Sequence, residues 1–287
     1  MSSDVVLYEV VDGVAVVTLN RPDRLNAWVP ELETAYFDHL IEAAQDTAVG
    51  AIVVTGAGRG FCSGGDTQFM QGIVGGTPPE DRMLTLPLTI PKLLVGAING
   101  ACAGLGFVQS LLFDVRFASE KAKFTAAFPR LGLIAEVGSS WLLPRLIGTS
   151  RALDLLMSGR IVLAEEAYQL GLVNQVYAPG ELLVRSIDYA RMVAQTCSPA
   201  SVATIRQQVY RDATRDLDAA YADAMRLELL SLKGPDFAEG MTAYVEKRRP
   251  RFPPYGHGTI FDGAEVAEVA ELTAAVELAG WPAGTPI

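Results

Sequence analysis

The chain has 287 residues, half of them hydrophobic, and its mean hydropathy is +0.25. This apolar content allows a sizeable core, and no apolar run approaches the roughly 18 residues that a membrane-spanning helix needs. The net charge of -10 argues against a nucleic acid partner, so local basic groups or backbone amides must hold any phosphorylated ligand.

The N-terminus and the cysteines favour a cytoplasmic protein. The opening "MSSDVVLYEV" has no basic region followed by an apolar stretch, so we expect no signal peptide. The chain has three cysteines, Cys62, Cys102 and Cys197. Their number is odd and they lack the spacing of metal ligands, which suits the reducing cytoplasm. His39 and His257 belong to no cluster that would bind a metal, so we expect no metal site.

The first half of the chain alternates predicted strands and helices. Two β-branched runs on either side of Asp12 and Gly13 predict a β-hairpin. Apolar residues at helical spacing predict a helix over 30–45. The runs "AIVVTG" (51–56) and "KLLVGAING" (92–100) predict buried strands.

The second half is predicted to become mostly helical. The pattern is helical from Gly100, then extended over 114–119 and 121–128. Beyond Gly138 most segments to about Arg249 have helical spacing. Strands that alternate with helices, followed by helices alone, indicate an α/β core with a helical C-terminal part.

Two glycine-rich turns each follow an apolar strand and lead toward a helix. They are Gly58–Asp66, "GRGFCSGGD", and Gly100–Gly106, "GACAGLG". Such a pair could aim two backbone N–H groups, near Gly65 and Leu105, at one point and stabilise an enolate or a tetrahedral oxyanion. The alternative interpretation is a pair of tight turns in an α/β fold.

The second turn also resembles the dinucleotide-binding motif of short-chain dehydrogenases. That motif belongs near the N-terminus, and its chemistry needs a tyrosine with a lysine four residues later. The nearest match here is Tyr244, which is followed by Arg248. NAD binding is therefore disfavoured.

Five ordered motifs resemble the crotonase, or enoyl-CoA hydratase/isomerase, superfamily. They are "GRGFCSGGD", "AINGACAGLGF", "EKAKFTAAFPRLGLIAEVGSSWLLPRLIG", "AYQLGLVNQVY" and "EGMTAYVEKRRPRF", and they span about Val5 to Phe252. The resemblance implies an α/β fold with a core of stacked ββα units, which form a superhelix, and C-terminal helices that mediate trimerisation. It also implies an acyl-CoA thioester as ligand and no separate cofactor, since coenzyme A is part of the substrate.

The resemblance further implies which residues form the site. The oxyanion amides are those of Gly65 and Leu105. The residues that line the acyl-CoA site are Arg24, Leu25, Ala27, Ser63, Gly64, Asp66, Thr67 and Phe128, with Lys247 from the last family helix. Arg24 is a local cation in a negatively charged chain, and Lys247 is expected to reach a neighbouring subunit's coenzyme A.

The acid–base residue decides the reaction. The two positions where hydratases of the family carry carboxylates are Val108 and Phe128 here, and neither side chain transfers a proton. Glu136 matches the acid of dienoyl-CoA and Δ3,Δ2-enoyl-CoA isomerases, and its apolar neighbours in sequence would raise the pKa of a carboxyl buried among them. The alternative is a Glu that caps the helix starting near Ser139.

The resemblance therefore implies an enzyme that moves the double bond of a 3-enoyl-CoA to give a 2-enoyl-CoA, with Glu136 as acid and base. An enoyl-CoA hydratase, another crotonase reaction such as thioester hydrolysis or retro-Claisen cleavage, and a non-catalytic CoA-thioester binding protein stay open. The expected organisation is a core over 1–195, a helical trimerisation part over 196–252, and a tail over 253–287 with one amphipathic helix. We expect a homotrimer or a dimer of trimers, with no nucleic acid and no membrane span.

Overall fold

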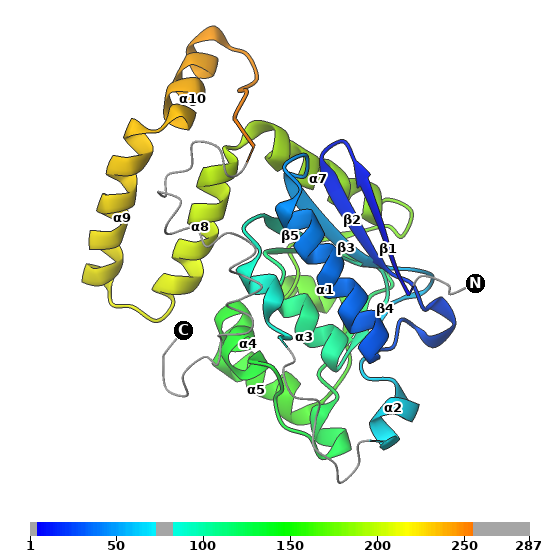
Figure 1. Cartoon of the computed structure of the whole chain (residues 1–287). Coiled ribbons are helices and arrows are strands. Elements are labelled where there is room, and N and C mark those ends of the chain that lie inside the picture. Colours follow the sequence, from blue (N-terminus) through cyan, green and yellow to red (C-terminus); the bar gives the residue numbers. More distant parts are fainter. Residues whose placement is uncertain (1–4, 73–82, 255–287) are drawn as a thin grey trace.

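The computed structural model describes residues 5–72 and 83–254, which form two β-sheets and a set of covering helices (Figure 1). The predicted tail helix lies outside these residues. The strands are β1 (Val6–Val11), β2 (Val14–Leu19), β3 (Ala51–Gly56), β4 (Gly60–Cys62), β5 (Leu93–Ile98), β6 (Ala101–Ala103), β7 (Val115–Ser119), β8 (Lys123–Thr125), β9 (Val162–Leu163) and β10 (Gln175–Tyr177). The α-helices are α1 (Pro30–Gln45), α2 (Thr67–Gly72), α3 (Leu105–Leu111), α4 (Ser139–Ile147), α5 (Thr149–Ser158), α6 (Ala164–Leu170), α7 (Leu182–Thr196), α8 (Pro199–Asp212), α9 (Leu217–Lys233) and α10 (Pro235–Glu246).

Three consecutive strand pairs are each divided between the two sheets. The six-stranded sheet has the order β1-β2-β3-β5-β7-β10, and the four-stranded sheet has the order β4-β6-β8-β9. In the pairs β3/β4, β5/β6 and β7/β8, the first strand joins the large sheet and the second joins the small one. Helix α2 follows the first pair, α3 the second and the 3-10 helix η3 (Phe128–Leu131) the third. These stacked ββα units confirm the predicted α/β architecture.

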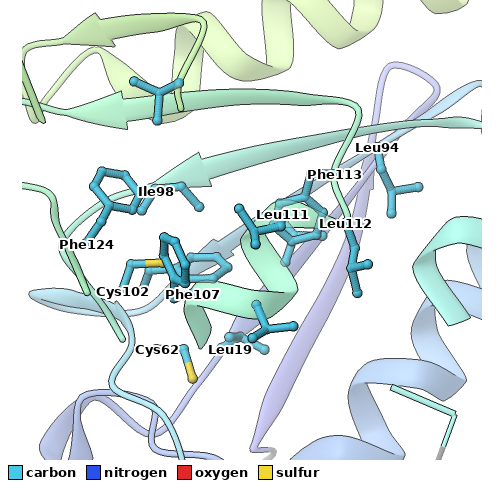
Figure 2. Packing of buried hydrophobic residues seen from close by; sticks show 14 of the residues in the cluster. Leu19, Cys62, Leu94, Ile98, Cys102, Phe107, Leu111, Leu112, Phe113 and Phe124 are labelled. Carbon is cyan, nitrogen blue, oxygen red and sulfur yellow. The ribbon is translucent and has the colours of Figure 1, made fainter. Parts of the chain in front are cut away.

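Both faces of the central strands β3 and β5 of the large sheet are buried. In β3, Ile52 and Val54 pack into the cluster that contains residues of α1 and α3, whereas Ala51 and Val53 face α7. Strands of a parallel sheet that is covered on both faces need continuous apolar sequence, which explains the run "AIVVTG". Figure 2 shows Phe107 and Leu111 of α3 packed beside Cys102 and Ile98 in the first cluster.

Several predicted elements are confirmed. Helix α1 covers the predicted residues 30–45, and the hairpin turns at Asp12 and Gly13, which both have positive φ. Two predictions were wrong. The segment after Gly100, predicted to be helical, first forms strand β6, and only residues 123–125 of the segment 121–128 are extended. Strand β6 forms because it pairs with β4 and β8, a tertiary contact that local spacing does not encode.

The C-terminal helices α8 to α10 follow the core, and Figure 1 shows α9 and α10 projecting away from the two sheets. Arg206 of α8, which is 8% exposed, anchors this part to the core. Its guanidinium group binds the Asp114 carboxylate at 2.8 Å and donates to the backbone carbonyl groups of Pro87, Leu88 and Ile90. No helix in the described part of the chain has the length and apolar character to cross a membrane.

Candidate active site

The two glycine-rich turns lie against each other at the carboxyl ends of β4 and β6. A Cβ on Gly64 would lie 3.0 Å from the carbonyl oxygen of Ala103, and one on Gly104 would lie 3.6 Å from the Cα of Gly64. Gly64 has φ +93° and Gly104 has φ +50°, conformations that glycine adopts without strain. This contact brings the next amides along the chain, those of Gly65 and Leu105, to neighbouring positions.

Both of these amides are free to donate. Trp28 pairs with Gly65 in a parallel bridge, in which Trp28 binds the Gly64 carbonyl and the Asp66 amide. The N–H of Gly65 therefore points away from Trp28. Leu105 is the first residue of α3, where helical N–H groups have no acceptor within the helix. Within residues 5–72 and 83–254, neither N–H has an intramolecular acceptor.

The segment 24–28 lies along the first glycine-rich turn. The sequence predicted that residues of 24–27 and 63–67 line the same acyl-CoA site. The amide of Ser63 donates to the carbonyl of Leu25 at 3.0 Å, and the amide of Trp28 donates to that of Gly64 at 2.8 Å. Ala27 is buried, whereas Arg24 and Thr67 are exposed at the surface. The structure thus brings the predicted residues of 24–27 and 63–67 together.

Arg21, which the sequence did not single out, and Asn26, which lies within the predicted stretch 24–27, hold this arrangement in place. The Arg21 guanidinium donates to the carbonyl of Ala27 and to the carboxylate of Asp66, at 2.5 and 3.1 Å. Asn26 is fully buried and has φ +55°. Its side chain accepts from the amide of Arg21 and donates to the carbonyls of Ala57 and Gly60. The sequence gives little indication of this role for Asn26. Any Asn tolerates positive φ, so the residue type alone does not mark this position.

The carboxylate of Asp66, predicted to line the acyl-CoA site, binds within the chain. It accepts from the Gln68 amide at 3.0 Å and from Arg21. Burial raises the pKa of this carboxyl, but the hydrogen bonds from the Gln68 and Phe69 amides and from Arg21 outweigh it, so the pKa lies below its ordinary value. Asp66 therefore orders the first turn as an anion.

We expect Asn26→Ala to lower the free energy of unfolding by about 2–4 kcal/mol, because the Arg21 amide and the Ala57 carbonyl lose their side-chain partner, the Gly60 carbonyl keeps only that of Asn99, and Ala is strained at positive φ. Asn26→Gly is the matched control, since it loses the same hydrogen bonds without the backbone strain. Urea unfolding of both variants measures the two contributions. Equal stability of Asn26→Ala and wild type would contradict this account of the turn.

Glu136 lies in the connection between η3 and α4, and its side chain is half-buried. The next residue, Val137, has φ +48°, a conformation that is costly for a β-branched side chain. The carbonyl of Glu136 accepts from the amide of Ser139, and α4 begins there with Gly138 as its N-cap residue. The connection therefore has a specific, strained shape at Glu136.

Among the apolar neighbours of Glu136 in sequence, Val137 packs against the first core cluster, whereas Leu133 and Ile134 lie at the surface. Ile134 is 80% exposed and Leu133 is 36% exposed, because the connection runs over the surface of the chain. The two positions that correspond to hydratase carboxylates are core residues instead. Val108 of α3 is fully buried and Phe128 is 2% exposed.

The remaining predicted residues lie apart from this site or have no catalytic chemistry. Lys247 is exposed at the end of α10, and Figure 1 shows α10 far from α2 and α3. Burial raises the pKa of the Cys62 thiol to about 12, which makes it a core side chain rather than a nucleophile. The described residues contain no cluster of three or more His, Cys, Asp or Glu side chains able to bind a metal.

The model of the enoyl-CoA hydratase/isomerase family matches residues 9–254 of the chain. The chain belongs to this family. Its fold and its sequence motifs agree with this membership, and the chain is accordingly an enzyme of the crotonase superfamily.

Relatives of the chain in this family include both isomerases and hydratases. A 1,2-epoxyphenylacetyl-CoA isomerase from Escherichia coli is 34% identical over 256 residues, which cover 86% of this chain and 97% of the relative. An enoyl-CoA hydratase from Alternaria alternata is 34% identical over 252 residues, covering 86% and 85%. The crystal structure of an enoyl-CoA hydratase from Polaromonas has a TM-score of 0.81 at 27% identity, covering 86% of this chain and 99% of that one.

Proposed function

We propose that this enzyme isomerises 3-enoyl-CoA thioesters to 2-enoyl-CoA thioesters. The observation that carries the choice of reaction is the set of side chains at the three acid–base positions of the family. Val108 and Phe128 are buried core residues, so Glu136 supplies the ionisable group at these positions. The strained backbone at Val137 supports a functional role for the connection that holds Glu136.

The proposed mechanism needs one carboxylate and two amides. Glu136 removes a proton from C2 of the 3-enoyl thioester, and the electron pair moves onto the thioester oxygen to form a dienolate. The N–H groups of Gly65 and Leu105 donate to this oxygen and stabilise its charge. Glu136 then returns the proton to C4, which leaves the double bond between C2 and C3. Atoms and charge balance, since the reaction only moves one proton.

Hydration of a 2-enoyl thioester is the alternative reaction of the family. It requires a base that activates water as well as an acid for the α-carbon. The buried apolar side chains at positions 108 and 128 do not hold or activate a water molecule. Glu136 alone can move a proton along the acyl chain, as isomerisation requires. It is less suited to activate a water molecule and also deliver a proton to the α-carbon, as hydration requires.

Turnover assays with 3-enoyl-CoA and 2-enoyl-CoA of several chain lengths test this proposal. Mass spectrometry separates the reactions, because hydration adds the mass of one water whereas isomerisation leaves the mass unchanged. We expect 3-enoyl-CoA to be converted to 2-enoyl-CoA with little hydration. Efficient hydration without isomerisation supports the hydratase, and tight binding without turnover supports a non-catalytic binding protein.

The enzyme is also proposed to assemble as a trimer or a dimer of trimers through its C-terminal helices. Large apolar side chains on these helices are strongly exposed, among them Leu217, Tyr221, Tyr244 and Val245. Burying them against other copies of the chain is favourable. In such an assembly Lys247 could reach the coenzyme A of a neighbouring subunit. Sedimentation that shows a stable monomer at micromolar concentration contradicts both statements.

A further inference from the structure

The thioether group of Met70 lies against Gly65, in the turn that carries one of the two free amides. Met70 belongs to the short helix α2, and its amide donates to the Asp66 carbonyl at 2.8 Å. A Cβ on Gly65 would lie 2.9 Å from both Cγ and Sδ of Met70. The Met70 side chain therefore fills the space that a side chain at position 65 would occupy.

This contact places the sulfur within reach of the Gly65 amide. A Cβ lies about 2.5 Å from its own amide nitrogen, so Sδ of Met70 lies no more than about 5.4 Å from the Gly65 nitrogen. The Met70 side chain is half-buried, so a small oxidant has access to it. The rotatable bonds of methionine let the sulfur turn toward the amide without any movement of the backbone.

Other methionines of the described chain provide a comparison. Met157 of α5 is 71% exposed, and Met192, Met225 and Met241 are 40–49% exposed on α7, α9 and α10. These four are more accessible to an oxidant than Met70, yet they lie on helices outside the two glycine-rich turns. The extent of their oxidation therefore measures how accessible a methionine is to the oxidant, without any effect on the two turns.

We propose that Met70 is an oxidation site at which hydrogen peroxide inactivates the enzyme. The O–O bond of the peroxide breaks and one oxygen bonds to Sδ, which is oxidised by two electrons while the peroxide is reduced to water. The sulfoxide oxygen is a strong hydrogen-bond acceptor, whereas the thioether sulfur is a weak one. It accepts from the Gly65 N–H and takes the place of the thioester oxygen. This inference rests on the proposed role of the Gly65 amide in isomerisation.

The test compares wild type, Met70→Leu and Met157→Leu after graded treatment with hydrogen peroxide. Peptide mass spectrometry gives the sulfoxide fraction at each methionine, and each protein's turnover of 3-enoyl-CoA is divided by its own untreated value. In wild type and Met157→Leu we expect turnover to fall in proportion to Met70 sulfoxide, with fully oxidised enzyme slowed on the order of 10²-fold. Met70→Leu should keep its starting turnover under the same treatment. Methionine sulfoxide reductase should restore the wild-type rate.

Three results overturn the inference: full turnover with Met70 oxidised, no oxidation of Met70 when Met157 is fully oxidised, or an equal fractional loss in Met70→Leu. Circular dichroism of the treated proteins separates inactivation at the site from unfolding, and loss of folded signal in parallel with turnover also overturns it. Failure of the proposed function is distinguishable, because untreated enzyme then fails to isomerise 3-enoyl-CoA before any peroxide is added.

Discussion

Glu136→Gln is expected to lose about 10²- to 10⁴-fold in kcat for 3-enoyl-CoA while its affinity for the thioester changes little. The amide keeps the shape and the hydrogen-bonding capacity of the carboxylate, so the half-buried position in the connection before α4 is preserved. It cannot accept the C2 proton or deliver one to C4. Both proton transfers therefore fail together.

Glu136→Asp is the matched control for this substitution. It keeps the carboxylate but withdraws it by one methylene group, so its turnover should fall between those of wild type and the Gln variant. Steady-state kinetics gives kcat, and calorimetry with a saturated acyl-CoA gives the affinity. Normal isomerisation by Glu136→Gln removes Glu136 from the mechanism.

Gly65→Pro is expected to reduce kcat by about 10²- to 10³-fold, which is the usual consequence of losing one oxyanion donor. The substitution deletes an N–H that has no acceptor within residues 5–72 and 83–254, so no hydrogen bond of the described chain is lost with it. The effect on turnover should therefore exceed the effect on stability.

Gly65→Ala separates the amide from the added side chain. It keeps the N–H, and its Cβ meets only the flexible end of Met70 at 2.9 Å. Turnover of the Ala variant should exceed that of the Pro variant at least about tenfold, since only the Pro variant lacks a donor. Thermal unfolding of both variants checks that they are folded. Equal turnover of the two would show that the Gly65 amide takes no part in the reaction.

The regular elements and the family were readable from local patterns. The helix over 30–45 follows from the 3.6-residue spacing of apolar side chains that pack on the sheet, such as Leu32, Tyr36 and Leu40. The strand 51–56 follows from a β-branched run buried on both faces. The two glycine-rich turns, and Glu136 as a candidate acid, came from motifs that are contiguous in sequence.

The short strands β4 and β6 were missed because each has three residues and exists through its partners in the second sheet. The hydrogen bonds of Arg21 to Ala27 and Asp66 were missed for a similar reason. They join residues up to 45 positions apart, and an arginine in a polar segment gives no signal of its partner.

By itself, the sequence determined the family, the alternation of strands and helices, and the glycines that let the backbone of the two turns come close. Those properties depend on residue types and on the spacing of residues close together in the sequence. Local sterics and the burial of apolar side chains then determine the local structure. Only the tertiary structure decided that Gly64 touches Gly104, that Ile134 is exposed beside Glu136, and that Met70 covers Gly65. These contacts arise when separate segments pack into one dense arrangement, and their geometry depends on the shapes of all the partners at once.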